Sequence, residues 1–127
     1  MMKQYTQGGV VYLVDFINRE TKAVDFQKFG HTRFVDVADR FKVEPDQYAK
    51  WEIRVLAKAH NNDIEKVKCA EEAFHSVFPK NLWIEEKIGG VTEIVEMDGK
   101  TRYNAIQCVR RLNEKWKKEK SRYENSA

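Results

Sequence analysis

Two short apolar segments near the start of the chain most constrain its fold. The first is Val10–Val14 and the second is Phe26–Gly30. In the first segment both alternating sets of side chains are apolar, which is typical of a central strand buried on both faces. A polar break at 18–21 separates the two segments, so we expect them to pair as an antiparallel hairpin.

The remaining pattern alternates strands and helices. Asp36 is placed to cap a short helix that buries Val37 and Phe41 and presents Arg40, and Pro45 is expected to mark the end of that helix. Alternation and 3.6-residue periodicity predict a strand over 53–59, a helix over 64–78, a strand over 91–97 and a helix over about 103–120. Asn61, Asn62 and Asp63 supply capping side chains for the helix over 64–78. This order predicts an α+β domain with a small, mainly antiparallel sheet flanked by helices.

Length and composition favour one domain. With 127 residues, of which 42% are hydrophobic, the chain is too short for two independent cores. We expect a core over about 8–98, followed by an added basic helix over about 101–122. No apolar run approaches the roughly 20 residues that span a bilayer, and the first residues do not resemble a signal peptide, so we expect no membrane contact and a cytoplasmic location.

The charge is distributed unevenly along the chain. The net charge is +3, but residues 99–127 carry nine Lys or Arg and three Asp or Glu, while the preceding residues have a net charge of −3. A basic C-terminal helix on an acidic body suggests a polyanion partner, although a solvated lysine-rich helix gives the same pattern. Cys69 and Cys108 are far apart and form no CxxC pattern, so we expect reduced thiols and no structural zinc site.

Glu71 occupies an unusual position for a carboxylate. In the helix expected over 64–78 it lies four residues after Val67 and three before Phe74, which places it within the apolar stripe. An unpaired charge is costly to bury, so a glutamate there needs a cation, a metal ion or a hydrogen-bond donor. The alternative is a glutamate at the edge of the stripe whose tip reaches water.

The order Tyr12, Lys28-Phe29-Gly30, Arg40 and Glu71 resembles the GIY-YIG nuclease domain. The resemblance is to the phage-type branch, in which a lysine replaces the second motif tyrosine, and it covers roughly Val10 to Met97. It implies a protein of a bacterial or phage-infected cell. Each motif alone is a weak indicator of the family, and the resemblance depends on the order of the motifs along the chain.

The resemblance implies a role for each motif residue. A hairpin that turns near Glu20 places Tyr12 opposite Lys28, which would favour the phenolate and make Tyr12 a general base. The alternative is that Tyr12 is a core aromatic residue and Lys28 a surface cation. Glu71 would bind Mg²⁺ (or Mn²⁺), a hard cation that one carboxylate, waters and a phosphate can hold.

Three further residues are candidates for contacts with phosphate. Arg40 corresponds to the arginine that neutralises the scissile phosphate in the family, and Arg33 is its rival because the spacing from Gly30 to Arg40 is long. His31 follows Gly30 directly and is a weaker candidate for a catalytic contact.

These roles together predict an Mg²⁺-dependent DNA endonuclease, and the resemblance implies products that carry a 5′ phosphate and a 3′ hydroxyl. The basic helix would bind the DNA backbone without sequence specificity. Its cations are Arg110, Arg111, Lys115, Lys117, Lys118, Lys120 and Arg122, and Trp116 lies within the same run. An alternative is a catalytically inactive DNA- or protein-binding module of the same fold, such as a phage regulatory or inhibitory factor. A third option is a homodimer through the apolar face of this helix, formed by Ile106, Val109, Leu112 and Trp116.

Overall fold

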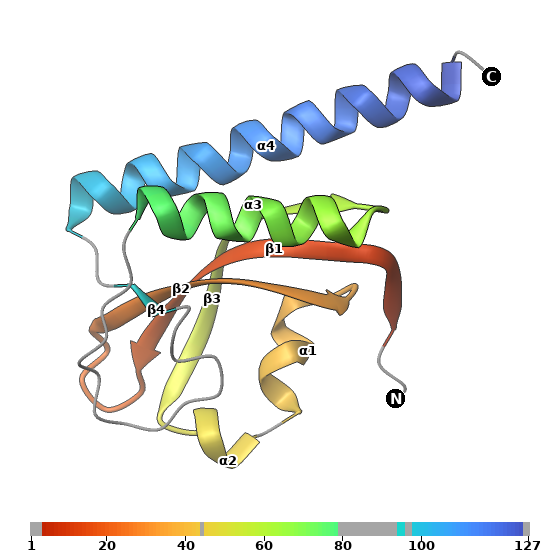
Figure 1. Cartoon of the computed structure of the whole chain (residues 1–127). Helices are drawn as coiled ribbons and strands as arrows, with labels where there is room; N and C mark the ends of the chain where they lie inside the picture. Colours follow the sequence, from red (N-terminus) through yellow and green to blue (C-terminus); the bar gives the residue numbers. More distant parts are fainter. Residues whose placement is uncertain (1–3, 44, 79–93, 96–97, 126–127) are drawn as a thin grey trace.

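The structure, a computed structural model, describes residues 4–43, 45–78, 94–95 and 98–125. Its centre is an antiparallel sheet in the order β3-β1-β2-β4 (Figure 1). The predicted α+β class and antiparallel sheet are confirmed. The strands are β1 (Tyr5–Asn18), β2 (Val24–Phe34), β3 (Trp51–Asn61) and β4 (Ile94–Val95), and the helices are α1 (Val37–Lys42), α2 (Pro45–Tyr48), α3 (Ile64–Val77) and α4 (Gly99–Asn125).

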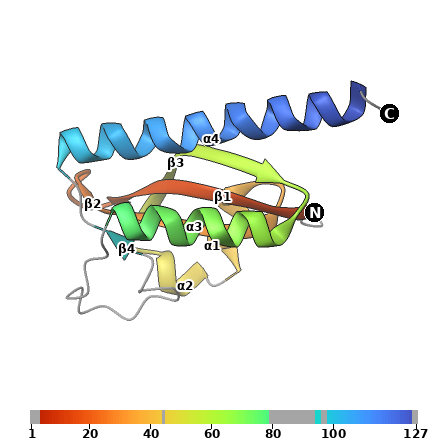
Figure 2. The same ribbon diagram turned by 45° about the horizontal axis from the view of Figure 1, so that its top comes forward.

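The central strand β1 is buried on both faces, as its apolar pattern predicted. Tyr12 and Val14 belong to a cluster that includes residues of α1 and α2. Val11 and Leu13 belong to two clusters that include residues of α3 and α4. The helices therefore cover both faces of the sheet, with α1 and α2 on one side and α3 and α4 on the other (Figures 1 and 2).

Two aspartates begin helices where the sequence predicted caps. The Asp36 carboxylate accepts a hydrogen bond from the Ala38 N–H at the start of α1, and that of Asp63 accepts one from the Glu65 N–H at the start of α3. Pro45 was expected only to end a helix, but it is also the first residue of α2. Proline suits a first helical position because that N–H has no intrahelical partner. Of the strand expected over 91–97, Ile94 and Val95 form β4 and the rest lies outside the described residues.

The C-terminal helix α4 is an integral part of the core rather than an added element. Ala105, Val109 and Trp116 are buried, and Trp116 is only 7% exposed. Ile106 and Leu112 pack against the same clusters. The apolar face considered for self-association therefore packs against the sheet within one chain, and a homodimer through this helix stays a prediction. None of the described helices combines the length and apolar character that crossing a membrane requires.

A buried ionic network, which the sequence analysis did not identify, ties α4 to the sheet. Asp15 on β1 has no exposed surface, and its carboxylate accepts hydrogen bonds from Gln27, Arg54 and Arg102. Arg102, in the first turn of α4, donates through both Nε and Nη2 at 3.1 and 2.5 Å. Burial raises the pKa of Asp15, but the hydrogen bonds from Arg102, Gln27 and Arg54 outweigh burial and hold that pKa below its ordinary value of 3.8.

Asp15→Asn should lower the free energy of unfolding by about 1.5–3 kcal/mol at neutral pH, because the charge-assisted hydrogen bonds from the partly exposed Arg54 and Arg102 are lost. The folded-state pKa of Asp15 is depressed, so its charge stabilises the fold above about pH 4, and this stabilisation is lost as pH falls through the folded-state pKa. Denaturant melts at several pH values should therefore show the difference between wild type and variant shrinking below about pH 4.

Glu65→Gln is the matched control for Asp15→Asn. Glu65 forms an exposed pair with Lys68 one turn along α3, so its replacement should change stability by less than about 0.5 kcal/mol. Equal losses in the two variants, or a difference for Asp15→Asn that persists unchanged at pH 2, would contradict the role given to this network.

A chain that ends at Gly99 should not fold, because Leu13, Phe29 and Ala57 would lose the side chains of α4 that cover them. Trp116→Ala should cost about 3–5 kcal/mol in the full-length chain, whereas Lys117→Ala, an exposed neighbour, should cost little. Thermal melts followed by circular dichroism test both statements. A cooperative melt of the truncated chain near the wild-type temperature would show that α4 is accessory after all.

Candidate functional site

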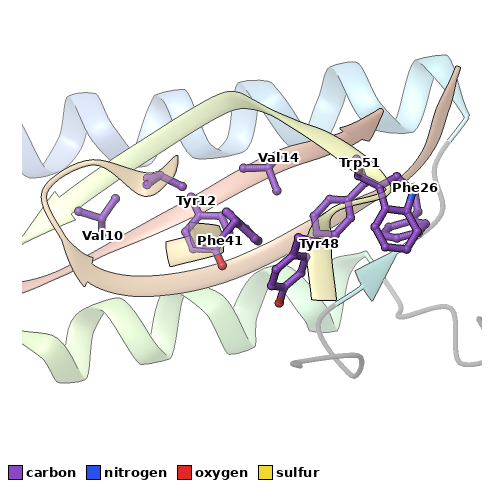
Figure 3. Close-up of a cluster of buried hydrophobic side chains, with 9 residues drawn as sticks. Val10, Tyr12, Val14, Phe26, Phe41, Tyr48 and Trp51 are labelled. Carbon is purple, nitrogen blue, oxygen red and sulfur yellow. The ribbon is translucent and has the colours of Figure 1, made fainter. Parts of the chain in front are cut away.

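Tyr12 lies directly opposite Gly30 in the β1–β2 ladder. A Cβ atom added to Gly30 would lie 2.5 Å from the Tyr12 hydroxyl oxygen and 2.7 Å from Cζ. The phenol ring therefore lies across β2, and Figure 3 shows its hydroxyl pointing toward that strand. This contact explains the glycine of the motif, since any other residue would collide with the ring.

Lys28 lies on the same face as Tyr12 but not directly opposite it. Its partner in the ladder is Val14, so Lys28 and Tyr12 are diagonal neighbours rather than the direct pair that we expected. Tyr12 and Lys28 are both 0% exposed, so Tyr12 is a core aromatic residue, as the alternative held, but the surface cation of that alternative is wrong. A lysine buried beside a phenol is a rare arrangement in a core and indicates a specific role for its charge.

The ring of Phe41 on α1 gathers three of the predicted site residues. The Tyr12 ring meets it edge-on at 5.7 Å between centroids, and the Lys28 Nζ lies 5.5 Å from its centroid. The Arg40 guanidinium carbon lies 6.0 Å from the same centroid. Phe41 was predicted only as a buried residue of the short helix. Its position next to Arg40 in the sequence was the available signal that it would lie at the site.

Glu71 lies on α3 with its side chain turned toward β2. It is 9% exposed, which confirms that its carboxylate belongs to the apolar side of the helix. Its Oε2 lies 3.0 Å from Nδ1 of His31 on β2. His31 was expected to contact phosphate, whereas in the structure its ring contacts the carboxylate. Neighbouring Phe29 stacks on Phe74 of α3 and holds this part of the helix against the strand.

The predicted site residues thus form two groups on either side of β2. Tyr12, Lys28 and Arg40 lie on the side of α1, while His31 and Glu71 lie on the side of α3. Lys28 and His31 are only three positions apart along the strand, and β4 pairs with β2 only at Gln27 and Lys28. Within the described residues, the outer edge of β2 beyond Lys28 is therefore not covered by a strand.

The chemistry of Glu71 suits a hard divalent cation. One carboxylate, already oriented by a histidine ring nitrogen, resembles the single protein ligand with which Mg²⁺ is often held beside waters and substrate phosphate. Among the described residues, no group of three or more His, Cys, Asp or Glu side chains could hold a metal ion. A site at Glu71 would therefore depend on water and substrate oxygens for its other ligands.

The predicted nucleic-acid contacts lie mostly away from this site. Arg33 is exposed on β2, while Arg40 is partly exposed on α1. The basic residues of the C-terminal helix belong to α4, which lies on the opposite side of the sheet from α1 (Figure 1). They are Arg110, Arg111, Lys115, Lys117, Lys118, Lys120 and Arg122, all of them exposed.

Gly30→Ala should destabilise the fold by about 1–3 kcal/mol, because the new methyl group would overlap the Tyr12 ring. Gly99→Ala is the control, since nothing lies within 4 Å of the corresponding added atom. Tyr12→Phe removes the closest atom, so Gly30→Ala should cost less in that background. Denaturant melts of the four variants measure this coupling, and additive effects would contradict the contact.

Comparisons with models of protein families, with curated proteins and with solved structures found no match to this chain. Any assignment of function must therefore come from the motif residues and their geometry. Two features carry most weight in that assignment. They are the phenol–lysine pair beside Gly30 and the buried carboxylate held by His31.

Proposed function

We propose that this protein is a GIY-YIG-like, metal-dependent endonuclease that hydrolyses DNA phosphodiester bonds. The observation that carries the proposal is the placement of Tyr12 and Lys28 beside Gly30 on the same stretch of β2 that holds His31 against Glu71. A phenol and a buried lysine on one face of this stretch of β2, and an oriented carboxylate on the other, are the residue types of the general base, charge partner and metal ligand that such a reaction needs.

Tyr12, assisted by the charge of Lys28, would remove a proton from the attacking water. Arg40, partly exposed on α1, would bind the non-bridging oxygens of the scissile phosphate, where negative charge grows in the transition state. Glu71 would hold Mg²⁺ (or Mn²⁺), which supplies stabilisation of the departing 3′ oxygen when it is bound. His31 is a positioning residue in this account, because it fixes the orientation of the Glu71 carboxylate.

A second candidate is a DNA- or protein-binding module that does not cleave its ligand. The exposed cations of α4 favour it, because they form a basic surface on the other side of the sheet from α1. Such a surface binds phosphate backbones without any help from Tyr12 or Glu71. The two candidates differ in whether the buried residues of β1, β2 and α3 affect cleavage.

Glu71→Gln should abolish metal-dependent cleavage, while Glu72→Gln, at the exposed neighbouring position, should leave it unchanged. Cleavage of an end-labelled DNA fragment in Mg²⁺ provides the first measurement. The rise in melting temperature on adding Mg²⁺ provides the second, since a bound ligand stabilises only the state that binds it. Wild type and Glu72→Gln should show this rise, and Glu71→Gln should not. Equal behaviour of the two variants would remove Glu71 as the metal ligand.

Lys28→Met and Tyr12→Phe should each lower the cleavage rate at neutral pH by about 10²–10⁴-fold, as expected for the loss of a general base. The double variant should be little slower than either single variant, because both residues act on the same proton. Single-turnover rates of the three variants, with melts to confirm folding, test this. Multiplicative losses in the double variant would show that Lys28 acts independently of Tyr12.

A further inference from the structure

The strand β3 forms one edge of the sheet. It pairs with β1, and within the described residues no strand lies on its other side. None of its 11 residues, Trp51–Asn61, is proline. A long strand edge presents N–H and C=O groups that a further strand can bind, so natural proteins usually shorten, cover or charge such edges. The residues of the candidate site lie on β1, β2, α1 and α3, so this edge is a separate feature of the molecule.

A bulge divides the edge of β3 into two unequal parts. Val55 and Ala57 pair with consecutive residues of β1, so Leu56 between them has no partner in the ladder. Beyond this bulge, Ala57 clusters with side chains of α4, and Lys58 is exposed. A bulge and an exposed lysine are both devices that prevent pairing at a sheet edge. The stretch before the bulge, Trp51–Val55, has neither device and can accept another strand.

The side chains of Trp51–Val55 form a self-complementary pattern. Ile53 packs against the cluster that contains residues of α1 and α2, and it shares that face of the sheet with Val55, which is 39% exposed. Glu52 and Arg54 point to the other face, and both are exposed. The exposed acid and the exposed base therefore stand at equal distances on either side of Ile53. An antiparallel strand with the same sequence presents the same two charges in reverse order.

Charge selects one register for such a pair of strands. Opposite residues of an antiparallel pair point to the same face, so two copies related by a twofold axis must be centred on a single residue. With Ile53 at the centre, Glu52 of each copy lies opposite Arg54 of the other, which gives two opposite-charge pairs. With Glu52 or Arg54 at the centre, like charges would lie opposite each other. Arg54 can serve both contacts, because its side chain is 54% exposed and only its Nη2 donates to Asp15.

We propose that two copies of this chain associate through the Trp51–Val55 edges of β3, antiparallel and centred on Ile53, so that one sheet runs through both copies. Main-chain hydrogen bonds between the two edges supply the affinity, and the two pairs of Glu52 with Arg54 fix the register. Because the paired stretch is short, the interface is small and the dimer is weak and concentration-dependent. The inference does not rest on the proposed function, since none of these residues belongs to the candidate site.

Cysteine cross-linking tests the register in the full-length chain, in a Cys69→Ser background because Cys69 is exposed. Ile53→Cys places the new thiols of two copies opposite each other, with Cβ atoms about 4.5–5.5 Å apart, so mild oxidation should give a disulfide-linked dimer on a non-reducing gel. Val55→Cys is the matched control on the same face. Its two copies would lie about 13 Å apart along the strands, so it should not cross-link although it is more exposed. Equal cross-linking of the two variants would overturn the register.

Sedimentation equilibrium tests the association itself. The apparent mass of the wild-type protein should rise with concentration from 15.0 kDa toward twice that value. Glu52→Arg places like charges opposite each other and should weaken the dimer by about tenfold or more. Glu72→Arg makes the same charge change at an exposed position on α3 and should leave the dimer unchanged. A wild-type protein that stays monomeric at all concentrations, or a dimer that Glu52→Arg does not weaken, would overturn the proposal.

Discussion

The burial of β1 on both faces is the constraint on which the rest of the structure depends. A strand with apolar side chains in both directions must be covered twice, so helices have to lie on each side of the sheet. Tyr12 and Val14 meet α1 and α2, while Val11 and Leu13 meet α3 and α4. The same alternation divides the candidate site, because consecutive residues of β2 also point to opposite sides.

Much of the fold follows from local patterns in the sequence. The continuous apolar run over 10–14 predicted the central strand, and Asp36 and Asp63 cap their helices as expected. The structure corrected the role of α4. The family resemblance ends near Met97 and suggested an accessory helix, but one apolar stripe through Val109 and Trp116 makes it part of the core.

The tertiary ion pairs could not be predicted from local patterns. Asp15 and Arg102 are 87 positions apart, and nothing in either neighbourhood indicates that they meet. The candidate site shows the same limit. The order of the motif residues suggested which residues to examine, but not that Lys28 is fully buried or that His31 contacts Glu71. Register and burial determine these contacts, and both are set by how the hairpin packs on α1 and α3.

The most direct test of the nuclease assignment is the conversion of supercoiled plasmid to nicked circles by the wild-type protein. We expect nicking in Mg²⁺, none in EDTA, and products that DNA ligase reseals, because the proposed hydrolysis leaves a 5′ phosphate and a 3′ hydroxyl. Absence of nicking by a folded protein that binds the plasmid would contradict the assignment. Nicks that ligase cannot reseal would contradict the proposed direction of bond cleavage.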